Sequence, residues 1–334
     1  MGSRAYKILQ YVVEAQHGLH VATKTKKWLG DAQVPKDRDA LRPAYNLGIR
    51  SRASENHLYQ KQISSLALTL DDSYYQGIAW LLAMTLNGGV TPSDLGGTPK
   101  AYSWAFTPGL TAATADTMDS FTVETGDDGR CYEVGYVMGR SIKFSAQMGA
   151  NQALKVSVDA FADEVTKVTA TAALAIPTIT PILANNTKFY VDALWADAGD
   201  TIHAGILRGW DLEIISGLHQ KFLNNSLIPN GHGVTYLDWK LALTLEDNSD
   251  AAEWFTWFQA QTAAAIRIEV PGPTISGQNT HNILFDLWGA PSQADPMGQE
   301  VDGNHIMPVT VDSLYNTTNS ATLACTLVTN VNTL

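Results

Sequence analysis

Hydrophobic and polar positions alternate along much of this chain, and one alternating phrase occurs twice. Leu66–Asp72 reads LALTLDD, and Leu241–Asp247 reads LALTLED, an offset of 175 from position 66 to position 241. Leucines at every second position are typical of a β-strand with one side on a core. We therefore predict a strand at each copy, with a repeated core of six leucines: Leu66, Leu68, Leu70, Leu241, Leu243 and Leu245.

A helix is predicted after each copy. Asp71-Asp72-Ser73 suits a helix N-terminus, and Asp250 with Glu253 has the spacing of a capping box. Apolar residues then recur at helical spacing in both places. Strand, cap and helix recur in one order at one offset, so we predict a duplicated β-rich unit with a flanking helix.

Boundaries follow from composition. Residues 1–62 are expected to form an N-terminal arm with the entry strands of the first unit, of which Tyr6–Val13 is the clearest. The rest of the first unit is expected over residues 63–180, up to a stretch with prolines and few charges, and the second unit over residues 181–334.

The clearest hairpin lies late in the first unit. Ile142, Phe144, Val156 and Val158 alternate with polar residues on both sides of a break at residues 148–151. One face is expected to be buried and the other wet. The wet face carries Lys143, Ser145, Gln147, Lys155, Ser157 and Asp159.

Residues 87–117 form a long stretch rich in Gly, Pro, Ser and Thr that also carries aromatic side chains. Long loops of this kind are usually functional, and aromatic residues argue against disorder. We expect Tyr102, Trp104 and Phe106 to dock on a neighbouring subunit.

Charge is uneven. Residues 1–62 hold 11 Lys and Arg against 5 Asp and Glu, a net charge of +6, whereas the remainder holds 11 against 28, a net charge of −17. An acidic body repels phosphate, so sequence-specific nucleic-acid binding is not expected. The arm is instead expected to pack on the acidic body of another subunit or ring.

Signals for chemistry are absent from the sequence. Phosphate-binding glycine motifs, a nucleophile elbow and a zinc-protease motif do not occur, so we expect neither an enzyme nor a bound cofactor or metal. Neither a membrane span nor an export signal is indicated, so synthesis and retention in a cytoplasm are expected. Cys131 and Cys325 are interpreted as buried free thiols, and His17 and His20 as solvent or interface histidines.

The chain resembles the major tail tube proteins of long, non-contractile-tailed bacteriophages. The resemblance is taken to cover nearly the whole chain, and the segments that carry it are Tyr11–Gly18, Val21–Thr23, Arg42–Gly48, Val90–Ser93, Tyr102–Pro108, Ser120–Asp127 and Arg130–Val165. The resemblance implies a mainly β fold, here with two tandem sandwich or barrel domains, that assembles into stacked rings around a channel for viral DNA. It implies a virion protein assembled in the host cytoplasm, with tape-measure, terminator and tip proteins as partners, and no catalytic residues.

Two units in one chain depart from the simplest members, so we expect a ring of three chains with pseudo-sixfold symmetry, lined by the wet hairpin face. Two alternatives remain open from the sequence. Six tryptophans in the second half favour a carbohydrate-binding or host-recognition β-sandwich of a phage tail, although core or interface positions explain them better: Trp195, Trp210, Trp239, Trp254, Trp257 and Trp288. A capsid or decoration protein is the other alternative.

Overall fold

The protein is mainly β, as predicted, with 54% of residues in strands and 9% in helices. The structure, a computed structural model, describes residues 7–34, 36–41, 58–110, 118–127, 129–149, 152–224, 226–296, 299–301 and 303–334. Part of the expected arm, Asp128 and the break at residues 150 and 151 lie outside this set, as does the similar segment Arg42–Gly48.

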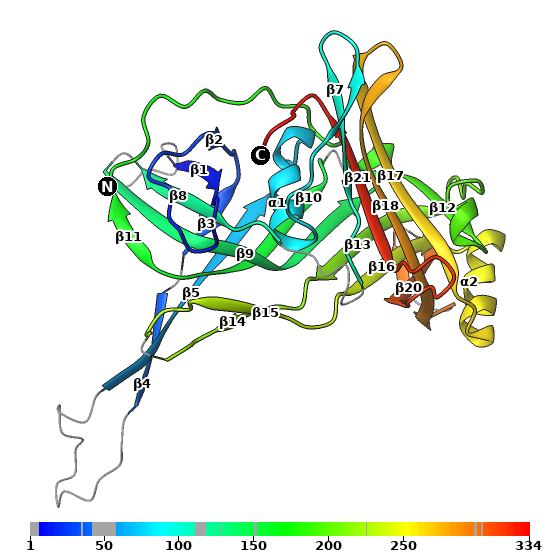
Figure 1. Cartoon of the computed structure of the whole chain (residues 1–334). Coiled ribbons are helices and arrows are strands. Elements are labelled where there is room, and N and C mark those ends of the chain that lie inside the picture. Colours follow the sequence, from blue (N-terminus) through cyan, green and yellow to red (C-terminus); the bar gives the residue numbers. More distant parts are fainter. Residues whose placement is uncertain are drawn as a thin grey trace, which may run out of the picture.

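One extended antiparallel sheet runs through the whole molecule (Figure 1). We call it the long sheet. Its strands, in spatial order, are β4 (Lys36–Leu41), β5 (Leu58–Leu70), β10 (Lys155–Ala162), β9 (Arg130–Gln147), β13 (Leu207–Ile215), β16 (Asp238–Glu246), β20 (Asn304–Ser313) and β18 (Asn279–Ala294). The short strand β3 (Asp31–Gln33) continues the line of β4 along β5, and β19 (Gln299–Val301) pairs with β20.

Two short sheets cover the buried face of the long sheet. The first contains β2 (Lys26–Lys27), β1 (Ile8–Val13), β8 (Phe121–Asp127), the start of β9 and β11 (Val165–Val168). The second contains β12 (Lys188–Asp192), β17 (Ala264–Ser276), the start of β18, β21 (Leu323–Thr329), β7 (Ala101–Phe106) and β6 (Ser93–Gly96). A separate hairpin is formed by β14 (Leu218–Lys221) and β15 (Gly231–Val234).

The two halves of the chain repeat one order of strand pairing. In the first unit β5 pairs with β10, β10 pairs with the end of β9, and the start of β9 pairs with β8 and β11. In the second unit β16, β20, β18, β17 and β21 pair in the same order. The two copies of the repeated phrase therefore occupy equivalent strands, and all six predicted core leucines are buried.

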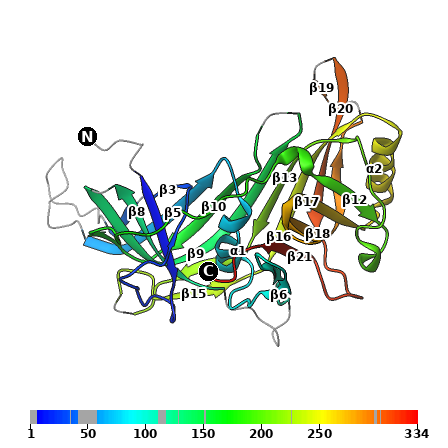
Figure 2. The same cartoon turned by 90° about the horizontal axis from the view of Figure 1, so that it is seen from above.

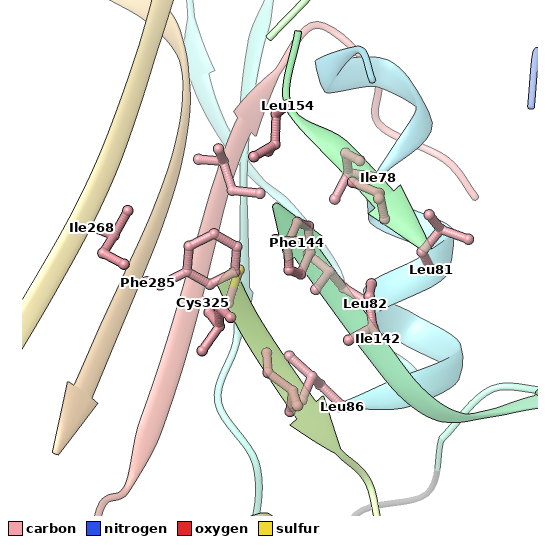
Figure 3. Packing of buried hydrophobic residues seen from close by; sticks show 14 of the residues in the cluster. Ile78, Leu81, Leu82, Leu86, Ile142, Phe144, Leu154, Ile268, Phe285 and Cys325 are labelled. Atoms are coloured by element: carbon pink, nitrogen blue, oxygen red, sulfur yellow. The ribbon is translucent and has the colours of Figure 1, made fainter. Parts of the chain in front are cut away.

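A helix follows each copy and packs an aromatic residue on the entry strand of its unit. In α1 (Ala79–Thr85) the Trp80 ring stacks on Tyr11 of β1 with ring centroids 4.2 Å apart. In α2 (Ser249–Ala260) the Trp254 ring stacks on Phe189 of β12 with ring centroids 5.9 Å apart. Figure 3 shows how Leu82 of α1 faces β9, whose Phe144 lies beside Phe285 of β18, so one core joins both units.

The predicted helix caps need correction. A short 3₁₀ turn precedes α1, and its N-cap position, Ile78, makes no side-chain cap hydrogen bond, so Asp71-Asp72-Ser73 does not cap it. In α2 the Ala251 amide donates to Asn248 Oδ1 over 3.0 Å, so Asn248 caps the helix instead of the predicted Asp250–Glu253 box.

The described strands of the expected arm are part of the first unit. β1 pairs with the whole of β8, and Leu9 and Tyr11 are buried against it. Burial of these apolar side chains against the core stabilises β1 in the first short sheet, whatever the net charge of the segment. Residues 8–13 therefore form an entry strand of the first unit, as expected, and packing of the arm on another subunit stays a prediction.

β9 passes from the first short sheet into the long sheet, and its backbone shows where. Tyr136 has φ of 53°, in the left-handed region, and its amide donates to Glu14 Oε1 over 2.9 Å. A Cβ on the preceding Gly135 would lie 2.1 Å from the His20 ring, so a larger residue does not fit there. The left-handed residue and its glycine neighbour let the strand change layers.

Candidate assembly surfaces

The wet face of the predicted hairpin is part of one polar face that crosses the long sheet. Strand register places Ser157 beside Lys143, Lys143 beside Glu213 and Glu213 beside Lys240. Along these strands every second residue points to the buried side. The six predicted residues lie together on this face, either exposed or half-buried: Lys143, Ser145, Gln147, Lys155, Ser157 and Asp159.

Carboxylates outnumber cations on the polar face. Five cations lie on or beside it, Arg140, Lys143, Lys155, Arg208 and Lys240, whereas seven carboxylates lie on β3, β10, β13, β16 and β20: Asp31, Asp159, Asp211, Glu213, Asp238, Glu246 and Asp312. Ion pairs neutralise several cations, with Lys143 Nζ 3.2 Å from Asp211 Oδ2 and Arg208 Nε 3.0 Å from Glu246 Oε2. The face therefore offers little net attraction to a polyanion.

The long sheet ends in two open edges. On one side the outer edge of β3 and β4 has no strand partner among the described residues, and on the other side the edge formed by the end of β18 and by β19 has none. Figure 2 shows β19 and β20 at one end of the molecule and β5 at the other. Unpaired edges present a row of free N–H and C=O groups that can pair with another chain.

The boundary between the two units shows how such edges fit. β9 and β13 pair antiparallel, from Ser141 opposite Ile215 to Gln147 opposite Gly209. By the repeated topology, the end of β18 corresponds to the end of β9, and β3 with β4 correspond to β13. The two open edges are thus the equivalents of two strands that already pair inside the chain.

A buried ionic cluster supports the first short sheet. The fully buried Lys24 ammonium contacts Glu133 Oε2 at 2.6 Å and Glu124 Oε1 at 3.3 Å, and it donates to the Val21 carbonyl. His20 bridges Asp163, with Nε2–Oδ2 2.7 Å, and Glu133. Hydrogen bonding to Asp163 chiefly raises the pKa of His20, to about 9, against the opposing effect of burial.

The histidine and cysteine predictions have different outcomes. His17 is exposed, as predicted, with Nδ1 3.0 Å from Ser120 Oγ, whereas His20 is half-buried and held by carboxylates inside the first unit. Cys131 and Cys325 are buried and free, as predicted. Among the described residues no group of three or more His, Cys, Asp and Glu is arranged to hold a metal ion.

The aromatic residues expected to dock on a neighbouring subunit have other positions. β7 pairs with β21 inside the chain, where Trp104 and Phe106 are buried in the core and the Trp104 indole donates to the Val331 carbonyl. Trp104 and Phe106 therefore face the core and not another chain, and Tyr102 is half-buried beside Thr329. The long stretch does dock, but on the second unit of its own chain.

The tryptophans do not form an exposed platform. Trp210, Trp239 and Trp254 are buried in the core, and Trp195, Trp257 and Trp288 are half-buried.

No described helix is long and apolar enough to cross a membrane. No known protein family model matches the chain, and no curated protein is significantly similar to it.

Proposed function

We propose that this chain is a structural subunit of a phage tail tube, in which three chains close a ring and stacked rings surround a channel for viral DNA. The observation that carries the proposal is the pair of open edges, which correspond to two strands already paired between the units. A head-to-tail contact of this kind joins unlike edges, and it generates a closed ring when the rotation between neighbours divides a full turn.

Strand number supports three chains. Each chain supplies four long-sheet strands per unit among the described residues: β4, β5, β10 and β9, then β13, β16, β20 and β18. Three chains give roughly 24 strands, which at about 4.8 Å spacing and about 40° tilt form a barrel of about 150 Å circumference. The bore is then about 35 to 40 Å after side chains, and six chains would double the backbone diameter.

The polar face suits the lining of this channel. Its opposite face is buried under the short sheets, so a barrel closed by the long sheet turns the polar face inward. Predominant carboxylates there keep phosphates from binding, which allows a duplex to pass without stalling. A carbohydrate-binding role gains no support, because three of the six tryptophans are buried.

Electron microscopy of the purified protein tests the proposal, with one variant aimed at the edge. The Asp295 amide donates to the Pro308 carbonyl on β20. Amides alternate sides along an antiparallel strand, so the Ala294 amide points to the open edge. Ala294→Pro removes that donor while leaving the β20 ladder intact.

We expect tubes with threefold end-on averages from the wild type and from the control variant Ala294→Ser. Ala294→Pro should remain a folded monomer without tubes. A wild-type chain that stays monomeric under all assembly conditions, or rings of six full chains, would contradict the proposal.

A further inference from the structure

The segment of residues 216–237, which contains β14 and β15, lies across the first unit. Leu218 is buried with Met118, Tyr136, Met138 and Phe161. The Tyr136 hydroxyl lies 2.8 Å from His232 Nδ1, and the Gln220 amide nitrogen lies 3.2 Å from the Ala162 carbonyl. In Figure 1 the hairpin runs beneath β9 toward β5. The second unit therefore already covers part of the first unit of the same chain with this segment.

The segment connects β13 to β16. The equivalent connection in the first unit joins β4 to β5, whose paired strands extend away from the body as a two-stranded ribbon (Figure 1). The hairpin brings Leu218 opposite Val234. The ribbon likewise pairs apolar residues, with Ala40 opposite Tyr59 and Leu41 opposite Leu58.

The surface of the second unit that corresponds to the covered surface of the first is open. Ala160 and Val311 are equivalent, because each pairs with an equivalent leucine, Leu66 and Leu241. Ala162, which accepts a hydrogen bond from the hairpin, thus corresponds to Ser313. Ser313 borders a cavity of about 570 Å³ that is also lined by Leu86, Pro108, Tyr236, Leu314 and Tyr315.

Apolar side chains in this cavity are left in solvent. Tyr236 is 91% exposed, Tyr315 48% and Leu314 43%. Clustered exposed apolar residues of this kind mark interaction sites on soluble proteins. In the first unit the corresponding surface is closed by the β14–β15 hairpin. In the second, the two ends of the same segment, Ser216 and Val234–Leu237, form one wall of the cavity, and no described residue fills it.

We propose that this cavity is the seat of the β4–β5 ribbon of the neighbouring chain in the ring. The proposal rests on the ring inferred above and deepens it, because it names the second contact that holds each pair of chains. The occupant is a second copy of this chain: edge pairing of β18 with β3 and β4 brings the neighbour's ribbon to the second unit, as β9–β13 pairing brings residues 216–237 to the first.

Photo-crosslinking tests the seat. A benzophenone amino acid replaces Tyr236, and the variant is assembled with an equal amount of ¹⁵N-labelled chain, so that hybrid peptides report contacts between chains only. We expect hybrid peptides that join position 236 to residues 36–41 or 58–63. The same probe at Ile176, which is exposed elsewhere, should not label these strands.

Two results would contradict the proposed ribbon-binding cavity but not the proposed ring: tubes whose hybrid peptides join position 236 to other segments, and tubes that give no hybrid peptides. A wild-type chain that forms no assembly removes the ring and the seat together. As a second measurement, the double variant Leu314→Ser, Tyr315→Ser should raise the concentration needed for assembly at least about tenfold, with unchanged thermal unfolding of the monomer.

Discussion

Lys143 of β9 and Asp211 of β13 form an ion pair across the boundary between the two units, with Nζ and Oδ2 3.2 Å apart. Ser145 Oγ also donates to Asp211. Both charged side chains are more than a third exposed, so solvent screens the pair. The apolar side of the same strands differs, because Phe144 is fully buried with its ring centroid 4.8 Å from that of Phe285.

The first prediction follows from this contrast. Phe144→Ala should lower the free energy of unfolding by about 3 to 5 kcal/mol, because it leaves a cavity where the units share a core. Lys143→Ala should change it by less than about 1 kcal/mol. Urea unfolding of both variants measures the difference, and equal losses would show that the boundary is held by its polar face.

The second prediction concerns the channel lining. A cysteine introduced by Ser157→Cys should react in tubes with a small maleimide but slowly with one carrying a long polymer, because the polymer enters only through the tube ends. The two native thiols do not interfere: burial raises the pKa of Cys131 to about 11 and raises that of Cys325 well above its ordinary value.

The control for the labelling is the same cysteine in the Ala294→Pro background, where unassembled chains should react quickly with both reagents. Equal protection from both reagents in tubes would place Ser157 at a contact between chains instead of in the channel.

The third prediction concerns the buried lysine. Lys24→Met removes the cation between Glu124 and Glu133 and leaves two carboxylates in a site that admits little water. The free energy of unfolding should fall by about 3 to 5 kcal/mol. Lys7→Met, which removes an exposed partner of Asp31, should cost less than about 1 kcal/mol in the same urea titration. Similar costs for both would mean that water reaches the cluster.

The fourth prediction is a pH dependence from His20. Its pKa is raised from 6.5 to about 9 in the folded protein, so the folded state binds its proton more tightly than the unfolded chain. This stabilisation is complete below pH 6.5 and is lost as pH rises through about 9. Its size should be about 1 to 2 kcal/mol after allowance for partial exposure.

Urea unfolding between pH 6 and pH 9.5 measures that loss, and His20→Gln serves as the reference because every other titrating group is common to both proteins. The difference in unfolding free energy between the two proteins should shrink as pH rises. A difference that stays constant with pH would show that the His20 contacts do not depend on its charge.

The sequence predicted several of the strands that have one face on the core and the other in solvent. The period of two made Leu66–Leu70 and Leu241–Leu245 visible, and their offset predicted the repeated topology. The same pattern placed Lys143 and Ser157 on one wet face. These features are local, so neighbouring positions along the chain carry the whole signal.

The sequence did not predict features that depend on pairing between segments far apart along the chain. Trp104 lies in a stretch rich in loop-forming residues, and its burial depends on the pairing of β7 with β21. The indole also donates to the Val331 carbonyl, 227 positions further along the chain. Lys24 looks like a surface charge until Glu124 and Glu133 are brought beside it. The alternation of residues in β1 predicted a strand, but only its pairing with β8 shows that the strand is part of the first unit.

β9 and β18 each belong to two layers at once, since each begins in a short sheet and ends in the long sheet. An outward push on the long sheet is therefore transmitted to the covering sheets along covalent main chain, and not only through side-chain packing. The two layers cannot separate without breaking the ladder at one end of each of these strands. The short sheets and the long sheet are therefore connected covalently through β9 and β18, so they should resist separation under load as one unit.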